Sequence, residues 1–375
     1  MSVYLDYNAT AKVRPQAAAA VARALELGGN PSSVHAAGRA ARAIVETARA
    51  DVGRLVGAKA ESVVFVSGGT EANALAIESA VDAGVKRIVV GATEHDAVLE
   101  NARATGLPLE VWPVDRGGVA DLDWLAGRLR QGPRALVCLM LANNETGVIQ
   151  PVAGAAELVQ AADGWLHVDA VQAAGKIAID LNQLGADTLA LSAHKLGGPQ
   201  GVGALVAGRR SVLSRRLHGG GQERGRRAGT ENTPGIAGFG AAALAALGEL
   251  PVMAVHAAWR DDLAAAVTRS GAEVLGAGGP RLPQTLCFAA PGFASELQVM
   301  GLDLAGVLVS AGAACSSGKV KPSRAVEAMG RADLAPCAIR VSGGWATTAA
   351  DWARCGEAWT EIFARHQARR AVAAA

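Results

Sequence analysis

Between about residue 60 and residue 210, short runs of β-branched residues alternate with longer alanine-rich stretches of helical period. This alternation predicts an α/β fold, in which a mainly parallel sheet is covered by helices on both faces. We expect the seven strands at 62–66, 87–91, 109–114, 135–141, 165–169, 188–191 and 203–207. Upstream, an amphipathic helix that packs on the sheet is predicted by the helical spacing of Ile44, Ala48, Val52 and Leu55.

The pattern changes after residue 210. Residues 218–230 are too rich in glycine and charge for a core element, which predicts a long functional loop. A connecting helix over 236–250 follows, and then helices and short strands resume with a second glycine-rich loop around Cys315. We therefore expect a large domain of residues 13–245 and a smaller α+β domain of residues 1–12 and 246–375 that carries the Cys315 loop.

Composition narrows the class of protein. Hydrophobic residues make up 50% and charged residues 19% of the 375 residues, which is typical of a folded globular protein. A formal charge of +2 argues against a nucleic-acid partner. No apolar run approaches the roughly 20 residues that span a bilayer, and the N-terminus lacks a basic segment followed by an apolar one. We expect a cytoplasmic protein that does not bind membranes.

Lys195 gives the strongest chemical signal. It directly follows a predicted buried strand and precedes a glycine-rich turn, in the order Ser192, Ala193, His194, Lys195. Its amine would lie at the edge of the sheet, where desolvation lowers the pKa and frees the amine to form a Schiff base. The alternative is a lysine that merely ends a strand, and the isolated motif favours neither interpretation.

Residues 65–73 join a strand to a helix through Gly68, Gly69 and Thr70. Backbone N–H groups at the start of a helix, together with a threonine hydroxyl, form a cradle suited to a phosphate. The alternative is an ordinary tight turn. The glycine spacing excludes a nucleotide-binding P-loop at this point.

Two further side chains follow predicted strands. Asp169 ends the strand 165–169 at the carboxyl edge, where open α/β sheets bind ligands, and a carboxylate is the partner that the pyridinium nitrogen of pyridoxal phosphate needs. A helix-capping aspartate is the common alternative. His95 could stack on an aromatic cofactor or shuttle protons, although a single histidine is more often structural.

The five cysteines are odd in number, widely spaced and free of C-x-x-C pairs, so neither a disulfide framework nor a zinc knuckle fits. Cys315 lies in a run of small residues, 310–318, which predicts a mobile and exposed thiol. Cys138 and Cys287 have apolar neighbours and are predicted to be buried and structural. Cys337 and Cys355 belong to no motif.

Taken in order, these segments resemble the cysteine desulfurases of the NifS and IscS type, which are pyridoxal-phosphate enzymes of aminotransferase fold type I, class V. The matching segments are 4–10, 29–35, 67–73, 94–95, 143–147, 168–172, 192–195, 226–230, 314–317, 322–323 and 339–340. From the first of these segments to the last, the resemblance extends over nearly the whole chain. The resemblance implies the large-domain and small-domain architecture of that fold.

The resemblance also implies roles for single residues. Lys195 would bind the cofactor, Asp169 its pyridine nitrogen, Gln172 its ring hydroxyl and His95 its ring face. The phosphate would be held by Gly69, Thr70, Ser192 and His194, with Thr230 reaching it from the other subunit of a homodimer. Asn144 and Arg340 match substrate-contacting positions. Arg340 can pair with an α-carboxylate, and its apolar neighbours disfavour a surface salt bridge as the alternative.

The activity implied is conversion of L-cysteine to L-alanine, with sulfur left on Cys315 as a persulfide for an iron–sulfur scaffold or another acceptor protein. No resident metal is implied, although Cys315 could bind a nascent iron–sulfur cluster. Selenocysteine lyase, cysteine-sulfinate desulfinase and, more distantly, a non-catalytic assembly subunit stay open. Ala193, Gly197, Ala11 and Lys321 depart from the family pattern, which puts phosphate packing and partner docking in doubt.

Overall fold

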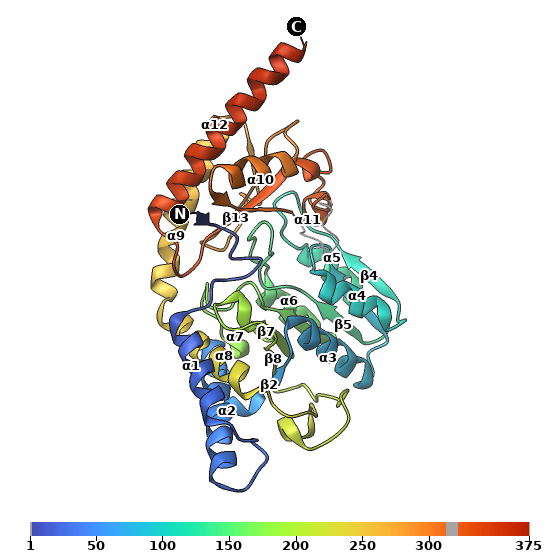
Figure 1. Cartoon of the computed structure of the whole chain (residues 1–375). Helices are drawn as coiled ribbons and strands as arrows, with labels where there is room; N and C mark the ends of the chain where they lie inside the picture. The colour runs from blue at the N-terminus through green and yellow to red at the C-terminus, as the bar shows by residue number, and fades with distance from the viewer. Residues whose placement is uncertain (1, 313–321, 375) are drawn as a thin grey trace.

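A seven-stranded sheet forms the centre of the computed structural model, which describes residues 2–312 and 322–374 (Figure 1). Its strands are β2 (Val63–Val66), β3 (Arg87–Gly91), β4 (Leu109–Trp112), β5 (Ala135–Cys138), β6 (Trp165–Asp169), β7 (Thr188–Ser192) and β8 (Gly203–Ala207). The order is β2-β8-β7-β6-β5-β3-β4, and β8 alone runs antiparallel to its neighbours in this sheet. All seven predicted strands are confirmed. The strands predicted at 109–114 and 135–141 end earlier, at Trp112 and Cys138.

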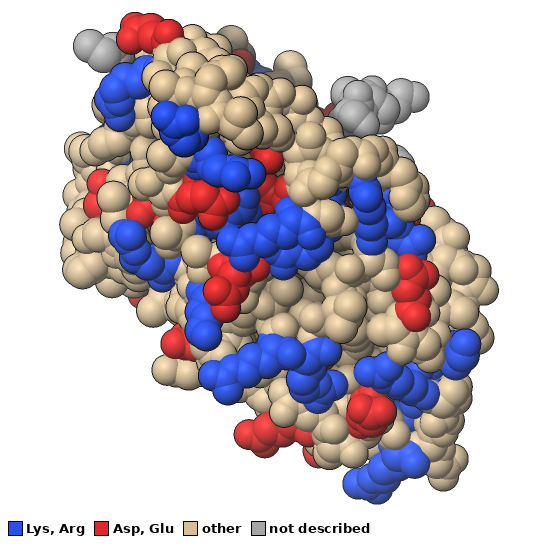
Figure 2. All heavy atoms as spheres, turned by 90° about the horizontal axis from the view of Figure 1, so that it is seen from below, with Lys and Arg blue, Asp and Glu red and all other residues tan. Residues whose placement is uncertain are grey.

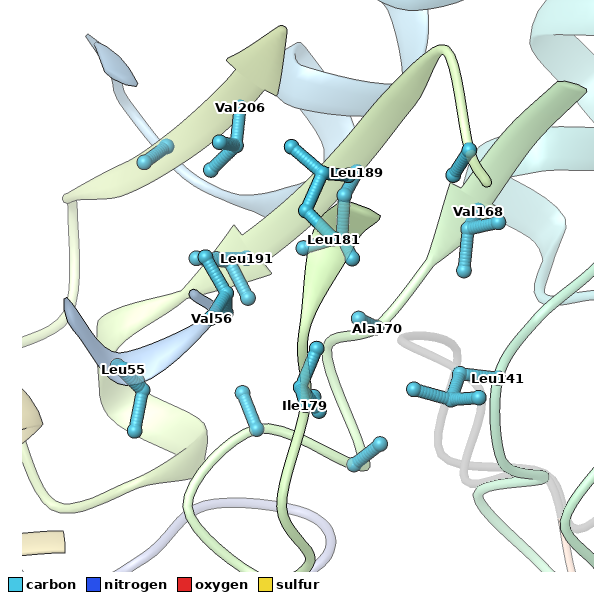
Figure 3. Packing of buried hydrophobic residues seen from close by; sticks show 14 of the residues in the cluster. Leu55, Val56, Leu141, Val168, Ala170, Ile179, Leu181, Leu189, Leu191 and Val206 are labelled. Carbon is cyan, nitrogen blue, oxygen red and sulfur yellow. The ribbon is translucent and has the colours of Figure 1, made fainter. Parts of the chain in front are cut away.

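Both faces of the sheet are buried. In β2, Val63 and Phe65 join the largest core cluster, whereas Val64 and Val66 join a cluster on the opposite face. Successive side chains of a strand point to opposite faces, so a strand buried on both sides reads as a continuous apolar run. Figure 3 shows the packing on one of these faces, where labelled side chains of β6, β7 and β8 lie near Leu55, Val56, Ile179 and Leu181.

Helices surround this sheet. They are α1 (Pro15–Leu27), α2 (Ala36–Leu55), α3 (Gly69–Asp82), α4 (Asp96–Ala104), α5 (Leu122–Leu129), α6 (Val152–Ala161), α7 (Leu181–Leu184) and α8 (Thr233–Gly248). The amphipathic helix predicted from Ile44 to Leu55 is part of α2, and its buried Ala48, Val52 and Leu55 belong to the main core. It contacts β2 as expected, but its principal neighbour is α8.

A second, smaller layer lies above the large sheet in Figure 1. It holds the antiparallel sheet β12-β13-β10-β9, made of Ser310–Ala311, Ala338–Ser342, Thr285–Ala289 and Glu273–Leu275. Its helices are α9 (Leu250–Arg269), α10 (Ser295–Leu304), α11 (Arg324–Ala328) and α12 (Ala349–Ala374). The N-terminal strand β1 (Val3–Tyr4) pairs in parallel with β11 (Val307–Leu308), and Leu5 is buried in the core of this region.

Four short 3-10 helices complete the described chain, at Ala60–Ser62, Ala193–Lys195, Gln222–Gly225 and Ala335–Cys337. The connecting helix predicted for 236–250 is α8, which meets α9 at a bend of 66°. By length and composition that bent pair could cross a membrane, while no single helix of the described chain is both long and apolar enough.

Seen from below, the surface carries Lys and Arg side chains with Asp and Glu between them (Figure 2).

Trp359 tests how the smaller core is held together. Its indole is fully buried, stacks on Phe363 at 4.9 Å between ring centroids, meets Phe288 edge-on at 5.1 Å and donates from Nε1 to Gln298 Oε1 at 2.9 Å. We expect Trp359→Ala to lower the free energy of unfolding by about 3–5 kcal/mol, because it leaves a large cavity.

Urea unfolding followed by circular dichroism measures this loss. The matched control is Val372→Ala on the same helix, where the side chain is 79% exposed, and it should change stability by less than about 0.5 kcal/mol. Equal effects of the two substitutions would contradict the packing described.

Candidate active site

A cavity of about 830 Å³ opens where the carboxyl ends of the parallel strands meet the smaller layer. Ten of the sequence-predicted site residues line it: Gly69, Thr70, His95, Asn144, Asp169, Gln172, Ser192, His194, Lys195 and Arg340. They come from the last residues of β6 and β7, from the segments that follow β2, β3, β5, β6 and β7, and from β13. Strand ends that are distant in sequence therefore meet at one edge, as open α/β sheets require of a ligand site.

Lys195 ends the 3-10 turn that directly follows β7. Its Nζ donates to the backbone oxygens of Asn8 at 2.6 Å and Ala9 at 2.7 Å. Burial, reinforced by the nearby cation of Arg340, lowers the pKa of Lys195 to about 8. The desolvation expected from the sequence is thus present, and the amine is poised to lose its proton near neutral pH.

The backbone of this turn is held by residues remote in sequence. The buried Lys176 donates from Nζ to Lys195 O at 2.8 Å, and the buried Arg14 donates from Nε to Leu196 O at 2.8 Å. Burial, followed by repulsion from Lys195, lowers the pKa of Lys176 to about 7. Sequence reasoning missed Lys176 because nothing in its segment marks a contact with Lys195.

Asp169 is fixed by a chain of hydrogen bonds. Its Oδ1 accepts from Val171 N at 2.9 Å and its Oδ2 from Asn73 Nδ2 at 2.8 Å, while Asn73 Oδ1 contacts His167 Nε2 at 2.9 Å. Burial lowers the pKa of His167 to about 4, so its ring is neutral. Because Asn73 presents its oxygen to the ring, the neutral ring donates from Nε2, and the amide group of Asn73 then faces the Asp169 carboxylate. Asn73 and His167 were not predicted as site residues.

Gln172 and Lys195 share one acceptor, the backbone oxygen of Asn8. Asn8 O receives Gln172 Nε2 at 3.0 Å as well as Lys195 Nζ. Gln172 Oε1 and Asn8 Oδ1 are buried without a hydrogen-bond partner within residues 2–312 and 322–374. Buried acceptors of this kind need a donor, which marks this part of the cavity for a polar ligand.

The start of α3 offers the expected anion cradle. No side chain caps this helix, and a Cβ on Gly69 would lie 2.9 Å from Val171 Cγ2. Across the cavity, His194 Nδ1 lies 3.2 Å from Thr10 Oγ1. Burial, followed by the charge of Lys195, lowers the pKa of His194 to about 4. Open backbone N–H groups and a neutral imidazole suit a phosphate.

Arg340 is buried in β13 and donates from Nη2 to Asp6 Oδ1 at 2.6 Å and from Nη1 to Asn144 O at 3.1 Å. The sequence disfavoured a surface arginine in a salt bridge; Arg340 is buried, and its ion pair with Asp6 was not predicted. The pairing arises because the N-terminal segment lies beside β13, where Asp6 bridges to Ser342. The guanidinium is not a surface group, however, and it still lines the cavity.

His95 caps α4, with its Nδ1 accepting from Ala97 N at 3.0 Å, and its ring is exposed to the cavity. Glu94 beside it is buried, accepts from Met140 N through Oε1, and leaves Oε2 without a partner in the described chain. Burial, followed by repulsion from Asp169, raises the pKa of Glu94 to about 8. Burial also raises the pKa of Glu145. Nothing in the sequence around Glu94 and Glu145 indicated that burial would raise the pKa values of their carboxyl groups.

Comparisons with known proteins agree with this geometry. The aminotransferase class-V model matches residues 3–354. A cysteine desulfurase of Cereibacter sphaeroides is 45% identical over 361 residues, which cover 93% of this chain and 92% of that protein. The chain belongs to the cysteine desulfurase family of class-V aminotransferases.

Two further relatives confirm the family and its fold. A cysteine desulfurase IscS of Dictyoglomus turgidum is 38% identical and covers 93% of this chain and 91% of its own length. The solved structure of a NifS-like protein from Rickettsia africae gives a TM-score of 0.89 at 30% identity and covers 97% of this chain and 99% of that one.

Pyridoxal phosphate is the cofactor of this family. The described residues fit it, since the cavity combines a lysine of lowered pKa, a fixed carboxylate, an open helix N-terminus and the orphaned oxygen of Gln172. Lys195 would hold its aldehyde carbon, Asp169 its ring nitrogen and the start of α3 its phosphate.

One predicted residue, Thr230, does not line this cavity. Thr230 is exposed and lines a separate hollow of about 200 Å³ with Phe65 and Glu223. Cys315 lies outside the described residues. Gly312 and Pro322, which stand on either side of residues 313–321, both line the main cavity.

The lowered pKa of Lys195 predicts its reactivity. In protein freed of pyridoxal phosphate, acetylation of Lys195 by acetic anhydride should reach half its maximal rate near pH 8, rather than near the value of about 10.4 of an ordinary lysine. Mass spectrometry of the labelled peptide measures this rate against pH. Arg340→Gln should move the midpoint upward, because it removes a neighbouring cation; a wild-type midpoint above pH 10 would refute the assignment.

Glu94 predicts a pH-dependent stability. Its folded pKa of about 8 exceeds the ordinary 4.5, so the folded protein keeps a proton that the unfolded chain releases. Stability should therefore fall as pH rises from about 4.5 to 8, and Glu94→Gln should remove that fall. Urea unfolding of cofactor-free protein at pH 5 and pH 8 tests this. Glu100→Gln, at a side chain 61% exposed, is the control. A Glu94→Gln advantage that does not grow with pH would count against a protonated Glu94.

Proposed function

We propose that this protein removes sulfur from L-cysteine, forms L-alanine and leaves the sulfur on Cys315 as a persulfide. The balance is L-cysteine plus the Cys315 thiol giving L-alanine plus the Cys315 persulfide. One observation carries the proposal: the cavity brings Lys195, with its lowered pKa, together with the fixed carboxylate of Asp169 and the guanidinium of Arg340.

Each residue of the cavity has a separate role in this proposal, which follows from its chemistry. When bound, pyridoxal phosphate supplies the electron sink that makes the Cα proton of the substrate acidic. The Lys195 amine takes that proton, since its pKa allows the neutral form near neutral pH. Arg340 exchanges its bond to Asp6 for the substrate carboxylate, and Asn144 lies beside it. His95, exposed to the cavity, transfers protons to and from the substrate.

Cys315 accounts for sulfur transfer. Its thiolate would attack the substrate sulfur, so that an S–S bond forms as the Cβ–S bond breaks. The persulfide would then pass to an iron–sulfur scaffold or another acceptor protein. Support comes from Gly312 and Pro322, the described residues on either side of 313–321, which both line the cavity. A cytoplasmic location stays a prediction from the sequence.

We also propose a homodimer with shared sites. The support is that Thr230 lies outside the cavity formed by its own chain and is exposed. A domain boundary near residues 12 and 245 is proposed likewise. It is supported by separate core clusters, of which one contains Leu5 together with residues of α9, α10 and α12.

The sharpest test separates cofactor binding from sulfur transfer. Cys315→Ala should bind pyridoxal phosphate and change its absorbance on addition of L-cysteine, because the residues of the cavity are untouched. It should release neither alanine nor sulfide, because no thiol takes the sulfur. Stopped-flow absorbance paired with an alanine assay measures both.

Lys195→Ala is the matched control and should lose the visible absorbance of the bound cofactor. Loss of cofactor from Cys315→Ala would show that the loop is structural. Near-wild-type alanine formation by that variant would exclude persulfide transfer through Cys315.

A further inference from the structure

Residues 223–225 adopt a left-handed backbone, which residues with side chains rarely take. Glu223 has φ 48°, Arg224 has φ 58° and Gly225 has φ 81°. Glu223 and Arg224 carry side chains, and Asp163 is the one other non-glycine residue of positive φ in the described ranges. Left-handed non-glycine residues are strained and persist where surrounding contacts impose them. These contacts should therefore be identifiable.

The side chain of Glu223 supplies them. Its carboxylate is buried and accepts from Arg49 Nη1 at 2.7 Å, from Arg49 Nη2 at 2.9 Å and from Phe65 N at 3.0 Å. Arg49, equally buried on α2, also donates to Val63 O at 2.9 Å and lies over the Phe65 ring at 4.9 Å. A bidentate pair thus fixes the loop to β2, the strand that leads into the anion cradle at α3.

Further contacts hold the rest of the loop against its own subunit. Arg226 Nη2 donates to Glu61 O at 2.8 Å, and Arg227 Nε donates to Glu71 Oε1 at 2.9 Å. Seven residues beyond Glu223, Thr230 is exposed. No residue of 218–230 lines the main cavity. In Figure 1 this segment, in yellow-green, extends from the lower edge of the molecule.

Stability does not explain this arrangement. Breaking a buried ion pair is costly, yet an apolar pair in its place is often as stable, and the strained backbone adds a further cost. The loop also contributes nothing to the cavity of its own chain. Its ordered and costly backbone is explained if it presents a side chain to a second copy of this chain.

We propose that Arg49 and Glu223 are positioning residues that hold the loop so that Thr230 reaches the phosphate site of the partner subunit. This inference rests on the proposed homodimer with shared sites. It adds that the geometry of one subunit's phosphate site is set by a buried ion pair in the other. The pair touches neither cofactor nor substrate and acts through Thr230.

Mixed dimers test the proposal. Two differently tagged chains are co-expressed, and one carries Lys195→Ala so that a single site gives the visible absorbance of bound pyridoxal phosphate. With Glu223→Gln on the Lys195→Ala chain, the intact site receives Thr230 from the altered loop. We expect its dissociation constant for pyridoxal phosphate to rise about tenfold, as for a weakened hydrogen bond to a charged group. With Glu223→Gln on the other chain, the constant should stay at the wild-type value.

Two controls make the result decisive. Pyridoxal, which lacks the phosphate, should bind all these dimers equally, whereas a general structural defect would weaken both ligands. If Glu223→Gln does not fold, the double variant Arg49→Met, Glu223→Gly is used in its place in the same dimers. This double variant removes both the buried charges and the backbone strain. Equal weakening in both arrangements, or of pyridoxal too, would overturn the positioning role.

Thr230→Ala in the same dimers tests the proposed shared site separately from the positioning role of Arg49 and Glu223. A trans effect of Thr230→Ala without one of Glu223→Gln would overturn the positioning role and leave the shared site standing. Absence of any trans effect of Thr230→Ala would overturn the shared site itself.

Discussion

The active-site cavity depends on the contact between residues 8–14 and the turn that carries Lys195. One carbonyl, that of Asn8, accepts from both Lys195 and Gln172, and Arg14 holds the turn from the other side. Asn8 is itself anchored to the smaller sheet through Ser342 and Thr285. The N-terminal segment therefore connects the large sheet to the smaller sheet and fixes the position of the Lys195 amine between them.

Burial at this junction sets the protonation of the groups around it. Desolvation disfavours charge, so the pKa values of Lys195, His194 and His167 fall while that of Glu94 rises. The charged groups that remain are paired or hydrogen-bonded, as Arg340 is with Asp6. A site of this kind holds groups that exchange protons near neutral pH, and its chemistry follows from position more than from residue type.

The sequence predicted most of the large sheet because each strand is buried on both faces and reads as an apolar run, as in β6 and β7. The residues after those strands were predicted for the same reason, since Asp169 and Lys195 are strand-end groups. Contacts made across the chain could not be predicted. Lys176 under Lys195, Asp6 on Arg340 and Glu223 on Arg49 depend on segments whose proximity only the tertiary fold determines.

The pairing of β1 with β11 bears on biosynthesis. Val3 lies beside Val307, so β1 finds its partner only after Val307 has been made, which is later than all seven strands of the large sheet. Domains otherwise fold as units during synthesis, and the large sheet can form from residues up to Ala207. Asp6 can pair with Arg340, and Asn8 with Thr285, only after these later residues have been made. A nascent chain can therefore hold an assembled sheet before it holds an assembled active site, which delays cofactor capture until Arg340 has been made.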